Sequence, residues 1–256
     1  MEGRSLLFSR GKFYSGTSNV VLPVPNKQFF PLAYQDKSRL CYYGSLFDSV
    51  EINSSFYKLP MPATVEKWSG MVPENFSFTF KLWKQITHNK GLIFDPEDVS
   101  RFFQVVDRSA EKRGCILVQF PPGVSMDYIV QLQALLFQIK DATAGLAWRI
   151  AVEFRHTSWY KEEVYDLLYD MEAAMVMHDM ATSAAPFREP EQDFVYLRFH
   201  GPEKGYRGSY TDEFLDEYAE YINGWLEEGK DVFAYFNNTM GDAVNNLRSL
   251  NDRIVK

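Results

Sequence analysis

The regular alternation of short apolar runs with longer amphipathic stretches constrains this chain most. Helical patterns lie between most of the runs, and strands that alternate with helices favour a parallel sheet. Eight such units in 256 residues predict a single (β/α)8 TIM-type barrel domain over residues 1–256, because such barrels typically run to about 250 residues. The eight predicted strands are residues 12–18, 49–54, 76–82, 115–120, 150–156, 173–179, 194–200 and 231–238.

The amphipathic stretches carry recognisable helix ends. The stretch 95–114 opens on acidic residues and closes on Gly114, and the stretch 211–230 closes in the same way on Gly229. Acidic residues are favourable at a helix start and glycine is common just past its end. No G-x-G-x-x-G pattern follows the first predicted strand, which disfavours a dinucleotide-binding sheet.

Charge and composition exclude some classes of protein. The net charge of −7 disfavours a broad basic surface for nucleic acid. The two cysteines, Cys41 and Cys115, lie in apolar surroundings, as expected of reduced core thiols in a cytoplasmic protein. No apolar run approaches the roughly 20 residues of a membrane span, and residues 1–13 lack the apolar stretch of a signal peptide. We therefore expect no membrane partner.

Side-chain alternation predicts where the polar groups of the strands point. In the fifth predicted strand, Val152 and Phe154 face one way while Glu153 and Arg155 face the other. The apolar side must pack on the helices, so the polar side must point into the barrel. Barrel enzymes keep their active sites at the C-terminal ends of the strands, and we expect a polar pocket there. The residues predicted to point inward are Glu51, Lys81, Gln119, Glu153, Arg198 and Asn237.

The histidines mark the same end of the predicted barrel. The chain has four, and each lies at or just beyond the end of a predicted strand. His178 alternates with neighbours that favour a buried core position, whereas the other three are candidates for the mouth of the pocket. Buried ions need partners. The three acidic groups Glu51, Glu153 and Asp179 are matched in number by Lys81, Arg155 and Arg198.

Several segments resemble the DUF72 (YecE-like) family. The matching pieces are "YSGTS", "VEINSSFYKLP", "FTFKLWKQITH", "LVQFPP", "AVEFRHTSW", "YLRFHG" and "YFNN" followed by "GDAVNN". They cover nearly the whole chain in order, although Asn19 and Val20 stand where the family usually carries Gly and Trp. The resemblance implies a TIM-barrel fold. It implies no reaction, since the family is named for its unknown function.

The favoured hypothesis is a hydrolytic or isomerising enzyme that uses carboxylate and histidine acid–base chemistry. Its substrate would be phosphorylated, carboxylated or sugar-like, and the sequence requires no cofactor. The catalytic candidates are Glu51, Glu153, His156, Asp179 and His200. The substrate-binding candidates are Lys81, His88, Gln119, Arg198, Tyr206 and Asn237. The glycine-rich stretch 201–211, with Tyr206 and Tyr210, is predicted to form a lid.

Other functions remain open at this point. A divalent metal held by Glu153, His156, Asp179 and His200 would suit an abasic-site nuclease-like or nucleic-acid-binding protein. Against it, no H-E-x-x-H motif or cysteine cluster is present, and the nearby arginines would repel a cation. The same residues also suit a non-catalytic binder of an anionic ligand, or a buried salt-bridge network that only fills the barrel.

Overall fold

All eight predicted strand segments form strands in the computed structural model, which describes residues 9–255. Residues 1–8, on which the expected absence of a signal peptide partly rests, lie outside the described residues. The sixth segment divides into two short strands. The strands are β1 (Phe13–Thr17), β2 (Ser49–Ile52), β3 (Ser77–Lys81), β4 (Arg113–Gln119), β5 (Arg149–Glu153), β6 (Ala173–Met175), β7 (Met177–His178), β8 (Phe194–Phe199) and β9 (Asp231–Phe236).

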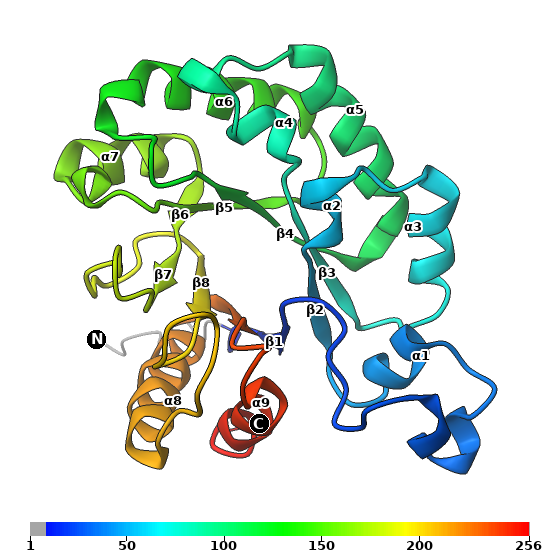
Figure 1. Cartoon of the computed structure of the whole chain (residues 1–256). Helices are drawn as coiled ribbons and strands as arrows, with labels where there is room; N and C mark the ends of the chain where they lie inside the picture. Colours follow the sequence, from blue (N-terminus) through cyan, green and yellow to red (C-terminus); the bar gives the residue numbers. More distant parts are fainter. Residues whose placement is uncertain (1–8, 256) are drawn as a thin grey trace, which may run out of the picture.

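Helices lie on the outside of the strands (Figure 1). Between residues 9 and 255, none of the helices has both the length and the apolar character needed to cross a membrane. The helices are α1 (Arg39–Gly44), α2 (Ser54–Tyr57), α3 (Pro62–Ser69), α4 (Lys84–Thr87), α5 (Pro96–Val106), α6 (Ile129–Ala142), α7 (Glu162–Asp170), α8 (Asp212–Glu227) and α9 (Ala243–Asn251).

One predicted helix end is confirmed and one is wrong. Gly229 follows α8 with a φ of 86°, the left-handed conformation that glycine adopts past a helix end. Helix α5 instead ends at Val106, and Gly114 lies inside β4. A Cβ at Gly114 would lie 2.5 Å from the hydroxyl oxygen of Ser77. That glycine therefore serves close strand packing rather than a helix end.

The strands are parallel, as predicted, but they do not form one closed ladder. One sheet has the order β2-β3-β4-β5-β6 and the other has the order β1-β9-β8-β7. Every strand pair in both sheets is parallel. The prediction of a continuously closed barrel is therefore wrong at two places, between β1 and β2 and between β6 and β7.

Side chains connect β1 and β2, which do not share a ladder. The hydroxyl of Tyr43, from α1, accepts a hydrogen bond from the Thr17 N–H at 2.7 Å and donates to the Ser49 carbonyl at 3.1 Å. The Asp48 carboxylate accepts a further hydrogen bond from the Ser15 N–H at 2.9 Å. Groups of β1 that would otherwise bond to β2 are thus satisfied by side chains, so the chain needs no ladder there.

The ladder is interrupted between β6 and β7 because the sixth strand segment changes its hydrogen-bonding partner from β5 to β8. The Val176 N–H still bonds to the Val152 carbonyl of β5 at 2.9 Å. One residue later Met177 pairs with Leu197 of β8. No helix occurs between β7 and β8, in contrast to the other crossovers expected of a barrel.

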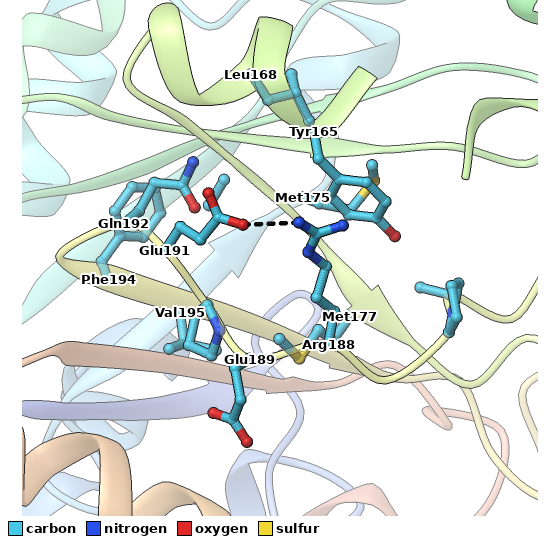
Figure 2. Close-up of a pocket in the computed structure, with 14 residues that line it drawn as sticks. Tyr165, Leu168, Met175, Met177, Arg188, Glu189, Glu191, Gln192, Phe194 and Val195 are labelled. Atoms are coloured by element: carbon cyan, nitrogen blue, oxygen red, sulfur yellow. Dashed lines mark hydrogen bonds and ion pairs between the residues drawn. The ribbon is translucent and has the colours of Figure 1, made fainter. Parts of the chain in front are cut away.

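The segment between β7 and β8 folds beside α7 and encloses a small cavity of about 40 Å³ (Figure 2). Leu168 of α7 and the two methionines Met175 and Met177 contribute to its apolar wall. Arg188 lies over the Tyr165 ring at 4.4 Å from the ring centroid and pairs with nearby acidic residues. The segment therefore covers the outer face of the strands where a helix is missing.

The alternation of side chains follows the predicted parity. Val152, Phe154, Leu197 and Phe199 belong to the main core, together with helix residues such as Leu215. A second apolar cluster contains the opposite parity of the strands and no helix residue. Its buried members are Cys115, Leu117, Ala151, Ala174, Val176, Phe194, Tyr196, Phe233 and Tyr235. The second cluster fills the space between the strands, so the polar residues of the same parity lie at its C-terminal end.

Candidate functional site

Arg198 of β8 is the centre of a buried ion-pair network. Its side chain is 1% exposed. The guanidinium donates to both carboxylate oxygens of Glu51, with Nη2–Oε1 at 2.6 Å and Nε–Oε2 at 2.8 Å. Its Nη1 also donates to Glu153 Oε2 at 2.7 Å. Three of the predicted inward residues therefore meet in the space between the strands.

Glu51 is held in its charged form at neutral pH. Besides Arg198, it accepts hydrogen bonds from the Ser18 hydroxyl at 2.6 Å and the Tyr196 hydroxyl at 2.7 Å. Burial alone would raise the pKa of Glu51, but Arg198 and the two hydroxyls hold it below its usual value. Sequence reasoning missed Ser18 and Tyr196. Tyr196 has the same parity as Arg198, so strand alternation was a signal that pointed to it.

Glu153 is held in the same way between two arginines. Arg155 Nε donates to Glu153 Oε1, and Arg198 occupies the other oxygen. Burial would raise the pKa of Glu153, yet the two guanidinium groups hold it well below its usual range. Both carboxylates are thus committed to arginine. We expect Glu51 and Glu153 to set the local charge rather than to exchange protons.

His200 contacts both arginines of the cluster through one ring nitrogen. Its ring Nε2 lies 2.8 Å from Arg155 Nη2 and 3.2 Å from Arg198 Nη1. A guanidinium only donates, so Nε2 must accept and the ring proton belongs on Nδ1, which lies 3.5 Å from Asp179 Oδ1. Burial lowers the pKa of His200. The ring is therefore a neutral imidazole that orients the two arginines.

Asp179 fixes the start of the loop that follows β8. Its Oδ1 accepts the backbone N–H of His200 at 2.6 Å, and its Oδ2 accepts the Tyr210 hydroxyl. Tyr210 also accepts the Gly201 N–H at 2.6 Å and is 8% exposed. Its predicted role in a lid is wrong, because its side chain is buried beneath the loop and anchors the loop to Asp179. Tyr206 is 40% exposed, with its ring centroid 5.9 Å from that of His200, and remains at the rim.

Lys81 differs from the other charged groups of the cluster. It ends β3, is half-buried, and its Nζ lies 4.2 Å from the centroid of the Phe56 ring of α2. Within residues 9–255, Nζ has no carboxylate within 4.0 Å and no hydrogen bond. Burial lowers the pKa of Lys81 to about 8; Arg198 adds to the effect, and Glu153 opposes it. Lys81 is therefore an amine that titrates near neutral pH.

The remaining substrate-binding candidates form a rim of mostly neutral groups. Gln119 and Asn237 are half-buried at the ends of β4 and β9. His88 is exposed at the end of α4, with its ring centroid 4.8 Å from that of Phe56. Partial burial of the ring, followed by the charge of Lys81, lowers the pKa of His88 to about 4. His88 therefore offers an uncharged ring beside the Lys81 amine.

Two histidines have local structural roles. His156 Nδ1 accepts the Ser158 N–H at 3.2 Å and caps the short 3₁₀ helix Thr157–Trp159. This nitrogen is therefore engaged in the cap and does not contact the polar cluster. His178 is 5% exposed, as expected of a core histidine, and its Nε2 lies 3.0 Å from the Phe154 carbonyl oxygen. Burial lowers the pKa of His178 to about 4.

The alternative metal ligands are not gathered into one donor set. Among the described residues, no group of three or more His, Cys, Asp or Glu side chains has an arrangement that could hold a metal ion. Of the alternative ligands, Glu153 gives its oxygens to arginines and His156 caps a helix. The geometry therefore does not support the metal-binding hypothesis for Glu153, His156, Asp179 and His200.

The C-terminal ends of the strands carry the predicted polar groups, which pack together as a cluster. The arginines and their carboxylate partners occupy the interior, and Lys81 lies at its half-buried edge. Two open cavities lie at the N-terminal ends of strands. One of about 970 Å³ is bordered by Arg149 and Asp193, and one of about 660 Å³ is bordered by Asp48 and Arg248.

The sequence profile of the family described as "Protein of unknown function DUF72" matches residues 14–256. The chain belongs to the DUF72 family. The UPF0759 protein YunF of Bacillus subtilis (strain 168) is 28% identical over 254 residues, which cover 86% of this chain and 88% of YunF. Family membership assigns no reaction, because the function of the family is unknown.

Solved structures of DUF72 proteins share the fold. A DUF72 protein of Enterococcus faecalis V583 is 22% identical and superposes with a TM-score of 0.77, over 94% of this chain and 95% of that chain. A DUF72 protein of Thermotoga maritima MSB8 is 25% identical and superposes with a TM-score of 0.68, over 94% of this chain and 97% of that chain. The arrangement of two parallel sheets is thus set in a fold that other DUF72 proteins share.

Proposed function

We propose that this DUF72 protein is an enzyme of isomerising or hydrolytic type that acts on a phosphorylated, carboxylated or sugar-like substrate at the polar cluster. The unpaired amine of Lys81 carries the proposal. A group with a pKa of about 8 both accepts and releases protons near neutral pH, which general acid–base catalysis requires. The acid–base role that the sequence suggested for Glu51 and Glu153 thus passes to Lys81.

The arginine network supports this role by fixing the charge around the amine. Glu51, Glu153 and Arg198 cannot leave one another without exposing a buried charge to an apolar interior. Their charges therefore stay constant while Lys81 gains or loses a proton. His200 is a positioning residue, because its ring holds Arg155 and Arg198 in place.

The substrate class follows from the groups at the edge of the cluster. A Lys81 ammonium is suited to a phosphate or carboxylate, since charge-assisted hydrogen bonds are among the strongest that a site can offer. Gln119, Asn237 and Tyr206 add neutral groups that suit hydroxyl oxygens. Arg198 is not proposed as a ligand for the anion, because its donors are already engaged.

Sulfate binding tests the site, since sulfate keeps its charge across the pH range used. Calorimetry should detect sulfate binding at about pH 6.5 and its loss at about pH 9.5, because Lys81 loses its charge as the pH rises through its pKa of about 8. Lys81→Met should weaken binding at the lower pH by about tenfold or more. The matched control is Lys84→Met, which removes an exposed amine three residues away.

Equal sulfate binding by wild type and Lys81→Met would remove the basis of the proposal.

Proton exchange distinguishes an enzyme from a protein that only binds the anion. Wild type should exchange the C2 proton of D-glyceraldehyde 3-phosphate with D2O, as seen by proton NMR, and Lys81→Met should lose about 100-fold or more of this rate. Sulfate binding without exchange would favour the non-catalytic binder of an anionic ligand.

A further inference from the structure

We propose that the Lys81 amine is a covalent nucleophile that forms a Schiff base with the carbonyl carbon of an aldehyde or ketone substrate. This inference rests on the proposed function and narrows its substrate class. The substrate would be a carbonyl compound that also carries a phosphate, a carboxylate or several hydroxyl groups. Lys81 would then act by forming a bond as well as by moving a proton.

The network distributes its charges so that Lys81 has no ion-pair partner among the described residues. Glu51 and Glu153 are the two buried carboxylates whose charges act on Lys81. Glu51 takes two hydrogen bonds from Arg198, and Glu153 takes one from Arg198 and one from Arg155. Every carboxylate oxygen is engaged without Lys81. An ion-paired ammonium has no free electron pair, whereas an unpaired amine can become neutral and attack a carbonyl.

Contacts with α2 fix the position of the Lys81 amine. The Lys81 carbonyl oxygen accepts a hydrogen bond from the Ser55 hydroxyl at 2.7 Å, which ties the end of β3 to α2. The same helix places the Phe56 ring 4.2 Å from Nζ. The aromatic face covers one side of the amine and offers no acidic partner. The ring therefore limits the directions from which a substrate could reach this half-buried amine.

The lowered pKa of the Lys81 amine also favours attack on a carbonyl. Burial and the charge of Arg198 lower the pKa of Lys81 to about 8. Relative to an exposed lysine with a pKa of about 10.4, this raises the neutral fraction at neutral pH by about 100-fold or more. The neutral amine is the form that attacks, so Lys81 should react well before other lysines of the chain.

The covalent step balances without any further reactant. Neutral Nζ attacks the carbonyl carbon, a C–N bond forms, and the π electrons move to the oxygen. The oxygen gains a proton as the nitrogen loses one, which gives a carbinolamine. The hydroxyl then takes up the proton that the Lys81 ammonium released to solvent when it became neutral, and cleavage of the C–O bond releases water and leaves a protonated imine. The positive charge of that imine replaces the ammonium charge near Glu51 and Glu153, so the cluster keeps its charge balance.

Reductive trapping tests the inference on the full chain. The protein is mixed with D-glyceraldehyde 3-phosphate and sodium cyanoborohydride, digested, and analysed by mass spectrometry. The peptide that contains Lys81 should gain the mass of the reduced adduct about tenfold faster than the peptide that contains Lys84. The labelling rate should rise with pH through the pKa of about 8 and level off above about pH 9, where most of Lys81 is neutral. Excess sulfate should slow labelling at Lys81 alone.

The variant Lys81→Arg separates failure of this inference from failure of the proposed function. Arginine keeps the positive charge and should retain sulfate binding, but its guanidinium does not form the adduct. Sulfate binding by wild type and Lys81→Arg, together with equally slow labelling of Lys81 and Lys84 in wild type, would overturn the covalent step and leave the proposed function standing. If the wild type itself did not bind sulfate, both the covalent step and the proposed function would be overturned.

Discussion

Arg198 and Glu51 form a two-point ion pair between strands of different sheets. The guanidinium of Arg198, on β8, donates to both oxygens of Glu51, on β2, at 2.6 and 2.8 Å. The same side chain reaches Glu153 on β5, in the sheet that contains β2. The two sheets lack a continuous ladder, and this buried pair joins them across the interior. The network thus has a structural role as well as its proposed part in the site.

Removing the cation of this network should strongly destabilise the fold. Arg198→Met leaves two buried carboxylates without their shared partner, and breaking a buried pair in this way typically costs about 3–5 kcal/mol. Urea unfolding measures the loss. The matched control is Arg253→Met, because Arg253 also joins two carboxylates, Asp212 and Asp216, but at the surface. That change should cost about 0–1 kcal/mol. Similar losses from both variants would contradict the buried role of Arg198.

Stability should fall in acid because of the same carboxylates. The pKa values of Glu51 and Glu153 are lowered in the folded state by Arg198. Their contribution to the free energy of unfolding is complete above the pKa of about 4.3 that glutamate has in the unfolded chain. It is lost as the pH falls through the lower pKa values of the folded state. Urea unfolding at a series of pH values should therefore show a decline below about pH 5. Glu153→Gln should flatten that decline, whereas the exposed control Glu66→Gln should follow the wild type.

Strand alternation was enough to predict much of the interior. Each apolar run formed a strand, and its parity correctly separated Phe154, which packs in the main core, from Glu153, which meets Arg198. These features depend on local periodicity, which a sequence displays directly. The exchange of partners at Val176 and the bridge made by Tyr43 depend instead on residues far apart in the chain. Periodicity carries no information about them.

Charge counting predicted that ions would pair but not which ions. Three acidic and three basic candidates suggested that Lys81 would have a carboxylate partner. The planar guanidinium of Arg198 instead serves two glutamates at once, which a single ammonium cannot do with the same geometry. Lys81 is consequently left unpaired. This property of the site depends on the direction of donors in space, and a count of charges cannot express it.

Asp48 should produce the opposite pH dependence in a different range. Burial raises its pKa from 3.8 to about 6, so the folded state disfavours its charge above that value. Stability should therefore rise by on the order of 1 kcal/mol from this residue as the pH falls from about 8 to about 5. Asp48→Asn should remove that rise, while its Oδ1 can still accept the Ser15 N–H. Thermal unfolding across this range is the measurement, with exposed Asp36→Asn as control. An unchanged rise in Asp48→Asn would contradict the assignment.

The Tyr210 hydroxyl should hold the loop 201–210 in its folded conformation by tying the end of the loop to Asp179 and to Gly201. It donates to Asp179 and accepts the Gly201 N–H at 2.6 Å. Gly201 has a φ of 101°, and a Cβ there would lie 2.3 Å from the Arg207 carbonyl oxygen, so the loop depends on a tight and uncommon backbone turn.

Tyr210→Phe removes both hydrogen bonds but keeps the buried ring. The loss of a buried hydrogen-bonded group typically costs about 1–3 kcal/mol, and local opening should exceed global unfolding because the bonds are confined to this loop. Trypsin should then cut faster after Lys204 and Arg207, both of which are exposed. The control Tyr221→Phe removes a hydroxyl that bonds only to the exposed carboxylate of Glu217. If Tyr210→Phe were cut at the rate of the wild type and of this control, the hydroxyl of Tyr210 would not be what anchors the loop.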